Sequence, residues 1–294
     1  MLNKLDTLGF IIKIMIQKMA VGIIGASRGI GRLLFESLKE TNIEVTGVSR
    51  HKRDVIVSKR SSYFEIDARY SLKLKTALES HETIIHCSHS VILSDFLSSG
   101  PEIKRLIAVG STRLFSNFED QKARDIRSMA EKIWNSKINA TLIHPTLTYG
   151  APGSNNVERI VRFCNLSPFI PIPEEGNTLI QPVSAQDLLQ GVLTCLKDDE
   201  TIGKTIIAAG GTSLSYKTFI ETCASSAGKK TKVIFFPSLP MKILARFTRL
   251  VPGVPSITAS ELERLFENKN FSNDEFRKLL GREPLTFPET LNGT

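Results

Sequence analysis

The chain has 294 residues, of which 41% are hydrophobic and 23% are charged, proportions of a globular protein and not of a disordered or fibrous one. Its 38 basic and 30 acidic residues give a net charge of +8, which favours anionic ligands, but the basic residues are dispersed and predict no nucleic-acid site. The four cysteines show no pair spacing, which is typical of a reduced cytoplasmic protein.

The first 18 residues include an apolar stretch from Leu8 to Ile16 that Lys13 interrupts. This stretch is shorter than the ~20 residues that a membrane-spanning helix needs, and no cleavage site for a signal peptide follows it. We therefore expect an N-terminal extension without stable membrane insertion, with Met19 as an alternative start. A weak anchor at a membrane surface is the other interpretation.

The segment from Val21 to Gly31 carries the most informative motif. An apolar run ends at Gly25, and Gly29 and Gly31 follow before an amphipathic stretch begins. This pattern predicts a strand, a tight turn and a helix N-terminus that binds the pyrophosphate of a dinucleotide. Gly25 permits the turn, Gly29 lets the backbone approach the phosphates, and Gly31 lets the helix pack on the strand. The other cofactor-binding residues predicted in this turn are Ser27, Arg28 and Ile30.

The end of the second predicted strand, over residues 43–48, indicates which dinucleotide binds. An acidic side chain there favours NAD(H), whereas arginine favours the extra phosphate of NADP(H). This chain has Ser49 and Arg50, then His51, Lys52 and Arg53, with no acidic residue before Asp54. Because a guanidinium can grip a phosphate with two hydrogen bonds, we predict that NADP(H) is preferred over NAD(H), with Arg28 adding a second cation.

With these motifs the chain resembles a short-chain dehydrogenase/reductase. Residues 25–31 have the glycine spacing of the one-domain reductases, and the later part is similar to the nucleotide-sugar epimerase/dehydratase branch. The segments that carry this resemblance are 64–68, 83–89, 105–112, 140–150 and 181–188. The resemblance implies that Asp67, Ala68, Cys87, Ser88 and Pro145 line the cofactor site and that Ser111 or Thr112 holds the place of the catalytic serine or threonine.

One departure from this family concerns its catalytic Tyr-x-x-x-Lys pair. Alignment on residues 130–132 puts Ala123 at the tyrosine position and Arg127 at the lysine position. Alanine moves no proton, and arginine is no general acid at working pH. The chain therefore resembles the atypical branch of the superfamily, which includes a dinucleotide-binding accessory subunit of respiratory complex I. Tyr149 remains a candidate acid/base, and the spacing of His86 and His89 around Cys87 predicts no metal site.

The residues after 150 predict a small substrate-binding part. We expect helices over 157–164, 187–196 and 216–227, strands over 205–209 and 233–236, a lid helix over 239–250, and a capping box at Ser272–Glu275 opening a helix that stops at Gly281. The predicted substrate contacts are Asn155, Asn156 and Gln181. The predicted fold is a doubly wound parallel sheet over 19–150, with 181–210 returning to it, and a discontinuous C-terminal subdomain over 151–180 and 211–294.

Two functional hypotheses follow from these patterns. The first is an NADP(H)-dependent oxidoreductase or epimerase that acts on a small molecule similar to a nucleotide sugar. The second is a dinucleotide-binding protein without turnover, with a structural or redox-sensing role in an assembly. The missing tyrosine and lysine favour the second, and the predicted substrate-binding subdomain favours the first. The sequence indicates no oligomeric state.

Overall fold

The computed structural model describes residues 19–51, 56–153, 156–173, 176–226, 228, 232–237 and 263–287. The predictions for residues 1–18, Lys52, Arg53, Asn155 and the lid segment 239–250 lie outside these residues. The chain divides into two compact units. The first comprises Met1–Gly110, Asp125–Ile143 and Val192–Thr205, and the second comprises Ser111–Arg124, His144–Gly191 and Ile206–Thr294. This division differs from the predicted boundaries, because it assigns residues 111–124, 144–150, 181–191 and 206–210 to the second unit.

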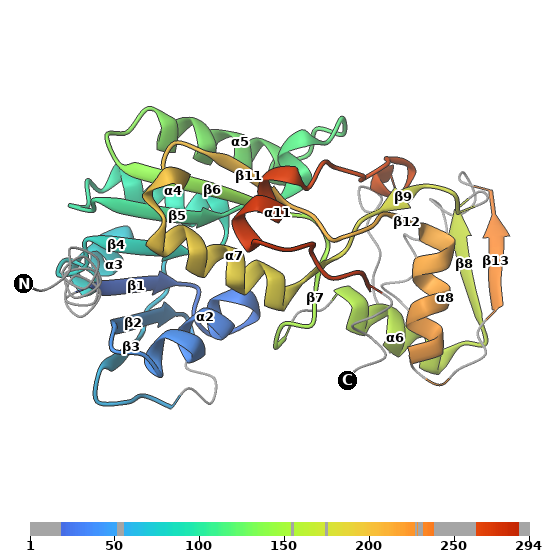
Figure 1. Cartoon of the computed structure of the whole chain (residues 1–294), viewed down its shortest axis with the longest axis horizontal. Helices are drawn as coiled ribbons and strands as arrows, with labels where there is room; N and C mark the ends of the chain where they lie inside the picture. Colours follow the sequence, from blue (N-terminus) through green and yellow to red (C-terminus); the bar gives the residue numbers. More distant parts are fainter. Residues whose placement is uncertain are drawn as a thin grey trace, which may run out of the picture. The chain divides into compact units, whose positions relative to one another are not determined.

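Seven strands form one parallel sheet in the order β11-β6-β5-β4-β1-β2-β3 (Figure 1). Their bounds are β1 Ala20–Ile24, β2 Glu44–Ser49, β3 Ser61–Glu65, β4 Thr83–His86, β5 Arg105–Val109, β6 Asn139–Pro145 and β11 Thr205–Ala208. The strand order reverses direction between β1 and β4, as in a doubly wound Rossmann sheet. The sheet and the smaller C-terminal part confirm the predicted α/β fold class.

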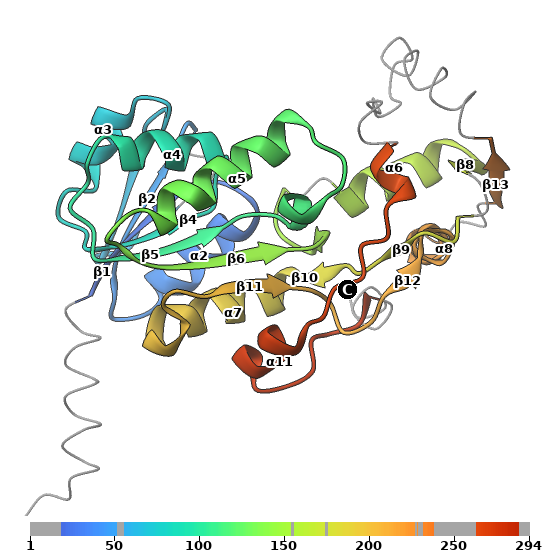
Figure 2. The ribbon, with the colours of Figure 1, turned by 90° about the horizontal axis from the view of Figure 1, so that it is seen from above.

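Helices cover both faces of this sheet. Figure 2 shows α3, α4 and α5 along one face and α2 and α7 along the other. Their bounds are α2 Gly29–Lys39, α3 Ser71–Ala77, α4 Ser90–Ser98, α5 Gln121–Trp134 and α7 Ala185–Lys197. Because both faces are covered, the central strands are almost uniformly apolar, and Ile23, Ile24, Ile84 and Ile85 are fully buried.

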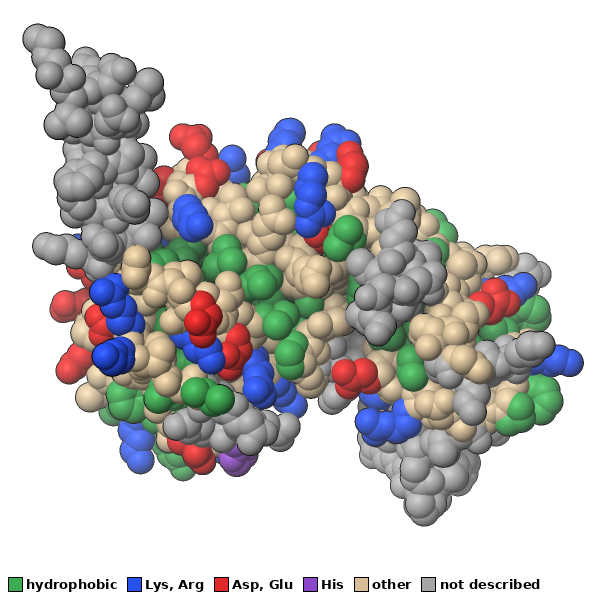
Figure 3. Space-filling view, turned by 60° about the horizontal axis from the view of Figure 1, so that its bottom comes forward, with side chains coloured by type: hydrophobic (Ala, Val, Ile, Leu, Met, Phe, Trp, Pro, Cys, Tyr) green, Lys and Arg blue, Asp and Glu red, His purple; other side chains and the backbone are tan. Residues whose placement is uncertain are grey.

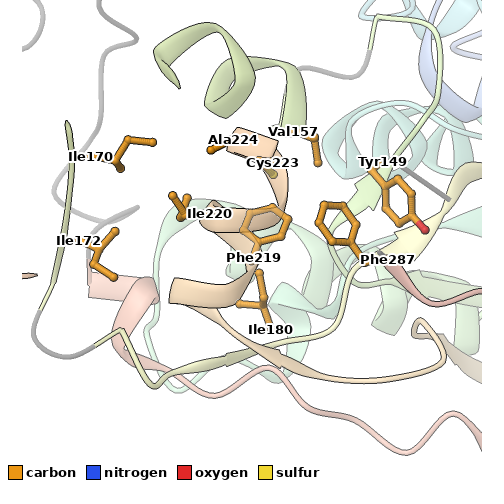
Figure 4. Close-up of a cluster of buried hydrophobic side chains, with 10 residues drawn as sticks. All are labelled: Tyr149, Val157, Ile170, Ile172, Ile180, Phe219, Ile220, Cys223, Ala224 and Phe287. Atoms are coloured by element: carbon orange, nitrogen blue, oxygen red, sulfur yellow. The ribbon is translucent and has the colours of Figure 1, made fainter. Parts of the chain in front are cut away.

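The second unit has its own hydrophobic core. Its remaining elements are η1 Thr112–Phe115, β7 Thr148–Tyr149, α6 Asn156–Leu166, β8 Phe169–Pro173, β9 Leu179–Ile180, β10 Val183–Ser184, β12 Leu214–Ser215, α8 Tyr216–Ser226, β13 Lys232–Phe236, η4 Arg264–Phe266 and α11 Asp274–Leu280. Figure 4 shows the rings of Phe219, Phe287 and Tyr149 in a row, with the Phe287 centroid 4.9 Å from each of the other two. Ile170 and Ile172 of β8 are buried in the same cluster.

Several predicted elements are confirmed with shifted ends, and one local prediction is wrong. Helix α2 begins at Gly29, and β3 ends at Glu65, so Asp67 and Ala68 follow that strand. Helix α11 ends as predicted at Gly281, which has a left-handed φ of 68°. The capping box at its start does not form, because the cap residue is Asn273, whose side-chain amide donates to the Gly210 carbonyl at 3.1 Å.

The charges on the surface are distributed as the dispersed basic residues of the sequence predict. On the face drawn in Figure 3, lysine and arginine side chains are interspersed with acidic ones and form no single basic stripe. Within the described part of the chain, no helix has the length and apolar character needed to cross a membrane.

Candidate functional site

The glycine turn lies where the strand order reverses. The amide of Gly25 donates to the Val48 carbonyl of β2 at 2.8 Å, and the amide of Cys87, just after β4, donates to the Ile24 carbonyl of β1 at 2.8 Å. These bonds place the turn at the carboxyl ends of β1, β2 and β4. In open α/β sheets, ligands bind in the crevice at this switch point.

The three glycines of the turn meet three different steric demands. Gly25 has a φ of +93°, which L side chains rarely adopt. A Cβ on Gly31 would lie 2.3 Å from the Gly25 carbonyl oxygen, so only glycine lets α2 pack this closely on the turn. At Gly29, with φ +60°, a Cβ would meet nothing within 4 Å, so the space beside that backbone is open.

The N-terminus of α2 completes a cradle for an anion. Its cap residue, Arg28, is extended and makes no side-chain capping bond, and the first turn contains no acidic residue. The first amides of an α-helix point outward from this end, which carries a partial positive charge. Open space at Gly29 and amides at the helix end fit a dinucleotide diphosphate, and Gly25, Ser27, Arg28, Gly29, Ile30 and Gly31 would hold it.

A cluster of hydroxyls joins the glycine turn to the ends of β2 and β3. Ser49 Oγ donates to the His51 carbonyl at 2.9 Å, so the hydrogen of the 2.6 Å bond between Ser49 Oγ and Tyr63 Oη belongs to Tyr63. Burial raises the pKa of Tyr63, and hydrogen bonds with the side chains of Ser49 and Ser27 oppose that rise. A Cβ on Gly47 would lie 2.8 Å from the Tyr63 ring, which occupies that space. No local sequence pattern marks Tyr63, because only pairing of β2 with β3 brings it to Ser49.

The charged residues predicted to recognise the adenosine half lie beside this cluster. Arg28 and Arg50 are exposed, with Arg50 directly after β2. Asp67 Oδ1 accepts a hydrogen bond from the Arg69 amide at 3.1 Å, and its carboxylate also accepts bonds from the Arg69 guanidinium. These bonds, and to a lesser degree the charge of Arg50, lower the pKa of Asp67 to about 2. The carboxylate is therefore already paired, and its contact with adenine stays a prediction.

The other residues predicted at the cofactor lie at or shortly after the carboxyl ends of β3, β4 and β6. Cys87 lies beneath the turn, where its backbone is 3.0 Å from a Cβ placed on Gly25, and burial raises the pKa of its thiol to about 12. Such a thiol is no nucleophile at neutral pH. Ser88 is half-buried after β4, whereas Ala68 and Pro145 are buried.

Ser111 and Thr112 lie in the second unit and differ in how their hydroxyl hydrogens are used. Ser111 Oγ accepts from the Arg113 amide at 3.2 Å and caps the short helix η1. Thr112 Oγ1 donates to the Pro145 carbonyl at 3.3 Å. A hydroxyl has one hydrogen to donate. Thr112 donates its hydrogen to Pro145, whereas Ser111 only accepts in its bond with Arg113, so its hydrogen can be donated to another acceptor.

His144, at the end of β6, supports the backbone of Ser111. Its Nδ1 lies 3.1 Å from the backbone of Ser111, and its ring packs edge-on against Phe115 at 5.7 Å. Burial lowers the pKa of His144 to about 4. The neutral ring is therefore a structural support for the Ser111 turn, and no local sequence pattern predicts this contact.

Tyr149 and Gln181, which were predicted to act on or contact the substrate, are both buried. Tyr149 has an exposed fraction of 3%, and Figure 4 shows its hydroxyl pointing away from Phe287. Gln181 is buried, its amide donates to the Gly210 carbonyl at 2.8 Å, and its carbonyl accepts from the Phe271 amide at 2.8 Å. Gln181 thus ties two backbone segments together. Asn156 begins α6. Among the described residues, no three His, Cys, Asp or Glu side chains form a metal site.

Two buried histidines predict a loss of stability in mild acid. Burial lowers the pKa of His86 to about 3 and that of His144 to about 4, below the unfolded value of 6.5. The unfolded chain therefore takes up protons first as pH falls below 6.5, so this contribution to stability is complete above 6.5 and declines toward pH 4. At ~1.4 kcal/mol per pH unit and site, we expect the free energy of unfolding, measured with urea, to be about 4 kcal/mol lower at pH 5 than at pH 7.

His86→Leu is the matched control for this pH effect. Within the described residues neither ring nitrogen of His86 makes a hydrogen bond, so leucine leaves no new unsatisfied partner. The variant should be as stable as the native protein at pH 7 and should lose about half of the difference between pH 7 and pH 5. An unchanged difference would contradict the assignment to His86.

The chain is similar to known proteins in its structure, without a match in sequence. Neither the known protein families nor the curated proteins contain a sequence match. A UDP-glucuronic acid 4-epimerase from Bacillus cereus, solved with UDP-glucuronic acid and NAD, superposes with a TM-score of 0.71 at 13% identity over 93% of this chain and 97% of its own. A dTDP-glucose 4,6-dehydratase from Bacillus anthracis, solved with NAD, gives 0.70 at 11% identity over 94% and 95%. A UDP-glucose 4-epimerase from Thermotoga maritima gives 0.68 at 11% identity over 93% and 96%.

These likenesses extend over nearly the whole of each chain, so they include the second unit as well as the Rossmann sheet. They give no support to the resemblance to the complex I accessory subunit. The chain has the fold seen in NAD-dependent nucleotide-sugar epimerases and dehydratases.

Proposed function

We propose that the protein binds NADP(H) at the glycine turn and acts as an oxidoreductase or epimerase on a nucleotide sugar. The observation that carries the cofactor part is the cradle formed by Gly25, Gly29, Gly31 and the N-terminus of α2, with open space at Gly29. The substrate class is supported by the fold, because the similar structures include enzymes solved with UDP-glucuronic acid and UDP-glucose.

The preference for NADP(H) rests on Arg50. The similar structures that name a cofactor name NAD, so they supply no argument for the extra phosphate. The preference is supported by the exposed position of Arg50 directly after β2, because the residue at the end of this strand distinguishes the ribose hydroxyl from the extra phosphate in Rossmann folds. When bound, the cofactor supplies hydride transfer, and the chain's own residues hold and orient it.

Arg50→Ala tests this preference. Charge-assisted hydrogen bonds contribute ~1.5–3 kcal/mol each, so the affinity for NADPH, measured by calorimetry, should fall by a factor of about 10–100. The affinity for NADH should stay within about twofold, because NADH lacks the phosphate. Arg60→Ala, in which an exposed arginine that donates to the Asn42 carbonyl is removed, should change neither affinity. Equal weakening of NADPH and NADH by Arg50→Ala would contradict the preference.

For the substrate, we assign the hydrogen-bond donor to Ser111, because Thr112 already donates to Pro145. The experiment is incubation with NADPH or NADP⁺ and a panel of UDP- and dTDP-sugars, with Ser111→Ala beside Thr112→Ala. We expect Ser111→Ala to lose turnover by a factor of about 100 and Thr112→Ala to lose much less. Absence of product with every sugar, although NADPH is retained, would contradict an enzymatic function.

A second candidate function is dinucleotide binding without turnover, as a structural or redox-sensing protein. The observation in its favour is Ala123 of α5, which stands at the family's tyrosine position and is buried. Retention of NADPH through purification together with the absence of product would favour this function over the first.

A further inference from the structure

Tyr63 of β3 lies across β2 in the first unit and reaches the end of that strand. Its backbone pairs with Gly47, and Ser49 follows two positions later on the same face of β2. A Cβ on Gly47 would lie 2.8 Å from the Tyr63 ring, so the absence of a side chain there makes room for the ring. The rings of Tyr63 and Phe35 of α2 pack edge to face, with centroids 5.4 Å apart. The packing of the ring therefore fixes where its hydroxyl lies.

The hydroxyls of Tyr63 and Ser49 form a directed chain of hydrogen bonds that ends on the turn containing Arg50. Tyr63 Oη donates to Ser49 Oγ at 2.6 Å, because the hydrogen of Ser49 is donated to the His51 carbonyl at 2.9 Å. Burial raises the pKa of Tyr63, so this hydroxyl keeps its hydrogen at neutral pH. The Ser49 carbonyl accepts from the Ile66 amide at 2.9 Å, which anchors the same residue to the segment after β3. The bond from Ser49 to His51 spans the backbone of Arg50 and closes the turn.

This closed turn determines where the Arg50 guanidinium can reach. Ser49 is only 5% exposed, so the bonds that hold the turn form away from bulk water, whereas Arg50 itself is exposed. An arginine side chain has several rotatable bonds, and a fixed backbone reduces the conformational freedom that binding of an anion must restrict. The hydroxyls of Tyr63 and Ser49 therefore act on the position of Arg50 without a charge of their own.

We propose that Tyr63, acting through Ser49, is a positioning residue for Arg50 and thereby contributes to the preference for NADP(H) over NAD(H). A hydroxyl that only stabilised the fold would affect both cofactors alike. A hydroxyl that positions Arg50 affects only the cofactor that carries the extra phosphate. This inference rests on the proposed function, because the position of Arg50 matters only if its guanidinium binds that phosphate.

Tyr63→Phe tests this inference, because it removes the hydroxyl and keeps the ring beside Gly47. By calorimetry on the full chain, we expect the affinity for NADPH to fall by a factor of about 5–10 and the affinity for NADH to stay within about twofold. Ser49→Ala, which removes the bond to the His51 carbonyl, should have the same selective effect. Tyr216→Phe, which removes a tyrosine hydroxyl from α8 of the second unit, should change neither affinity.

A double-mutant cycle with Arg50→Ala shows whether Tyr63 acts through the arginine. When Tyr63→Phe is added to the Arg50→Ala variant, the affinity for NADPH should change by less than about twofold, because the group that Tyr63 positions is gone. Equal weakening of NADPH and NADH by Tyr63→Phe would overturn the inference. A loss of NADPH affinity of about 5–10-fold that persists without Arg50 would also overturn it.

Folding of each variant is checked by thermal unfolding, in which Tyr63→Phe should lower the midpoint by a few degrees at most. Native affinity of Tyr63→Phe for NADPH, together with a selective loss in Arg50→Ala, would overturn the positioning role and leave the proposed cofactor preference standing. An Arg50→Ala variant that binds NADPH as tightly as the native protein would overturn the preference and, with it, the role assigned to Tyr63.

Discussion

Gly31→Ala is expected to abolish dinucleotide binding, with a loss of NADPH affinity of about 100-fold or more by calorimetry. The added methyl group would lie 2.3 Å from the Gly25 carbonyl oxygen and 2.9 Å from its carbon. Both atoms belong to the backbone of the turn, so the contact is relieved only if α2 or the turn moves. Such overpacking also costs about 1–3 kcal/mol of stability, measurable by urea unfolding.

Gly203→Ala separates the loss of stability from the loss of binding. Gly203 has a φ of +78°, and a Cβ there would meet nothing within 4 Å. Alanine should therefore cost ~1–2 kcal/mol through its backbone conformation alone and leave NADPH affinity unchanged. If Gly31→Ala binds NADPH as tightly as the native protein does, the turn between β1 and α2 does not hold the diphosphate.

Arg105→Met should give the largest loss of stability in the first unit. The Arg105 guanidinium donates to the carbonyls of Cys195 at 2.8 Å and Asn139 at 3.1 Å and to the hydroxyls of Thr141 at 2.8 Å and Thr201 at 2.9 Å. It thus connects β5 and β6 with α7 and with η2, Asp199–Thr201. Methionine would leave these buried acceptors without a donor, at a cost of about 3 kcal/mol in urea unfolding.

Two further variants test whether the hydrogen-bond network accounts for this effect. Arg105→Lys keeps the charge but lacks the planar fork, so we expect it to remain destabilised. Arg60→Met removes an exposed arginine and should change the free energy of unfolding by less than about 0.5 kcal/mol. A stability of Arg105→Met equal to that of the native protein would show that the network contributes nothing net.

The sequence predicted the sheet and the turn well because their signals are local. The apolar run before Gly25 and the run over 43–48 marked β1 and β2, and the resemblance segments 83–89, 105–112 and 140–150 contain β4, β5 and β6. The ends were less well predicted. The resemblance segment 64–68 only overlaps its strand, which is Ser61–Glu65. Pairing with β2 sets the limits of that strand, and pairing is not visible in the strand's own residues.

The candidate site was only partly predictable for the same reason. Gln181 has a polar side chain of the kind that contacts substrates. In the fold, its amide nitrogen donates to the Gly210 carbonyl and its amide oxygen accepts from the Phe271 amide. Ser111 and Thr112 are neighbours with equivalent side chains in the sequence, and only the position of the Pro145 carbonyl distinguishes them. Buried polar groups take whichever partner the packing brings to them.

By itself, the sequence determined that the chain forms a Rossmann-type sheet with a glycine turn after its first strand, because the positive φ of Gly25 and the close approach at Gly31 disfavour every other residue type. The tertiary structure alone decided which side chains surround that turn and the loop after Ser111. Tyr63 reaches Ser49 across two paired strands, and Glu267 reaches Ser116 across 151 residues of chain. The physical reason is that the backbone geometry of a turn depends on the residues of the turn itself. Hydrogen bonds between residues far apart in the sequence form only after the core has packed.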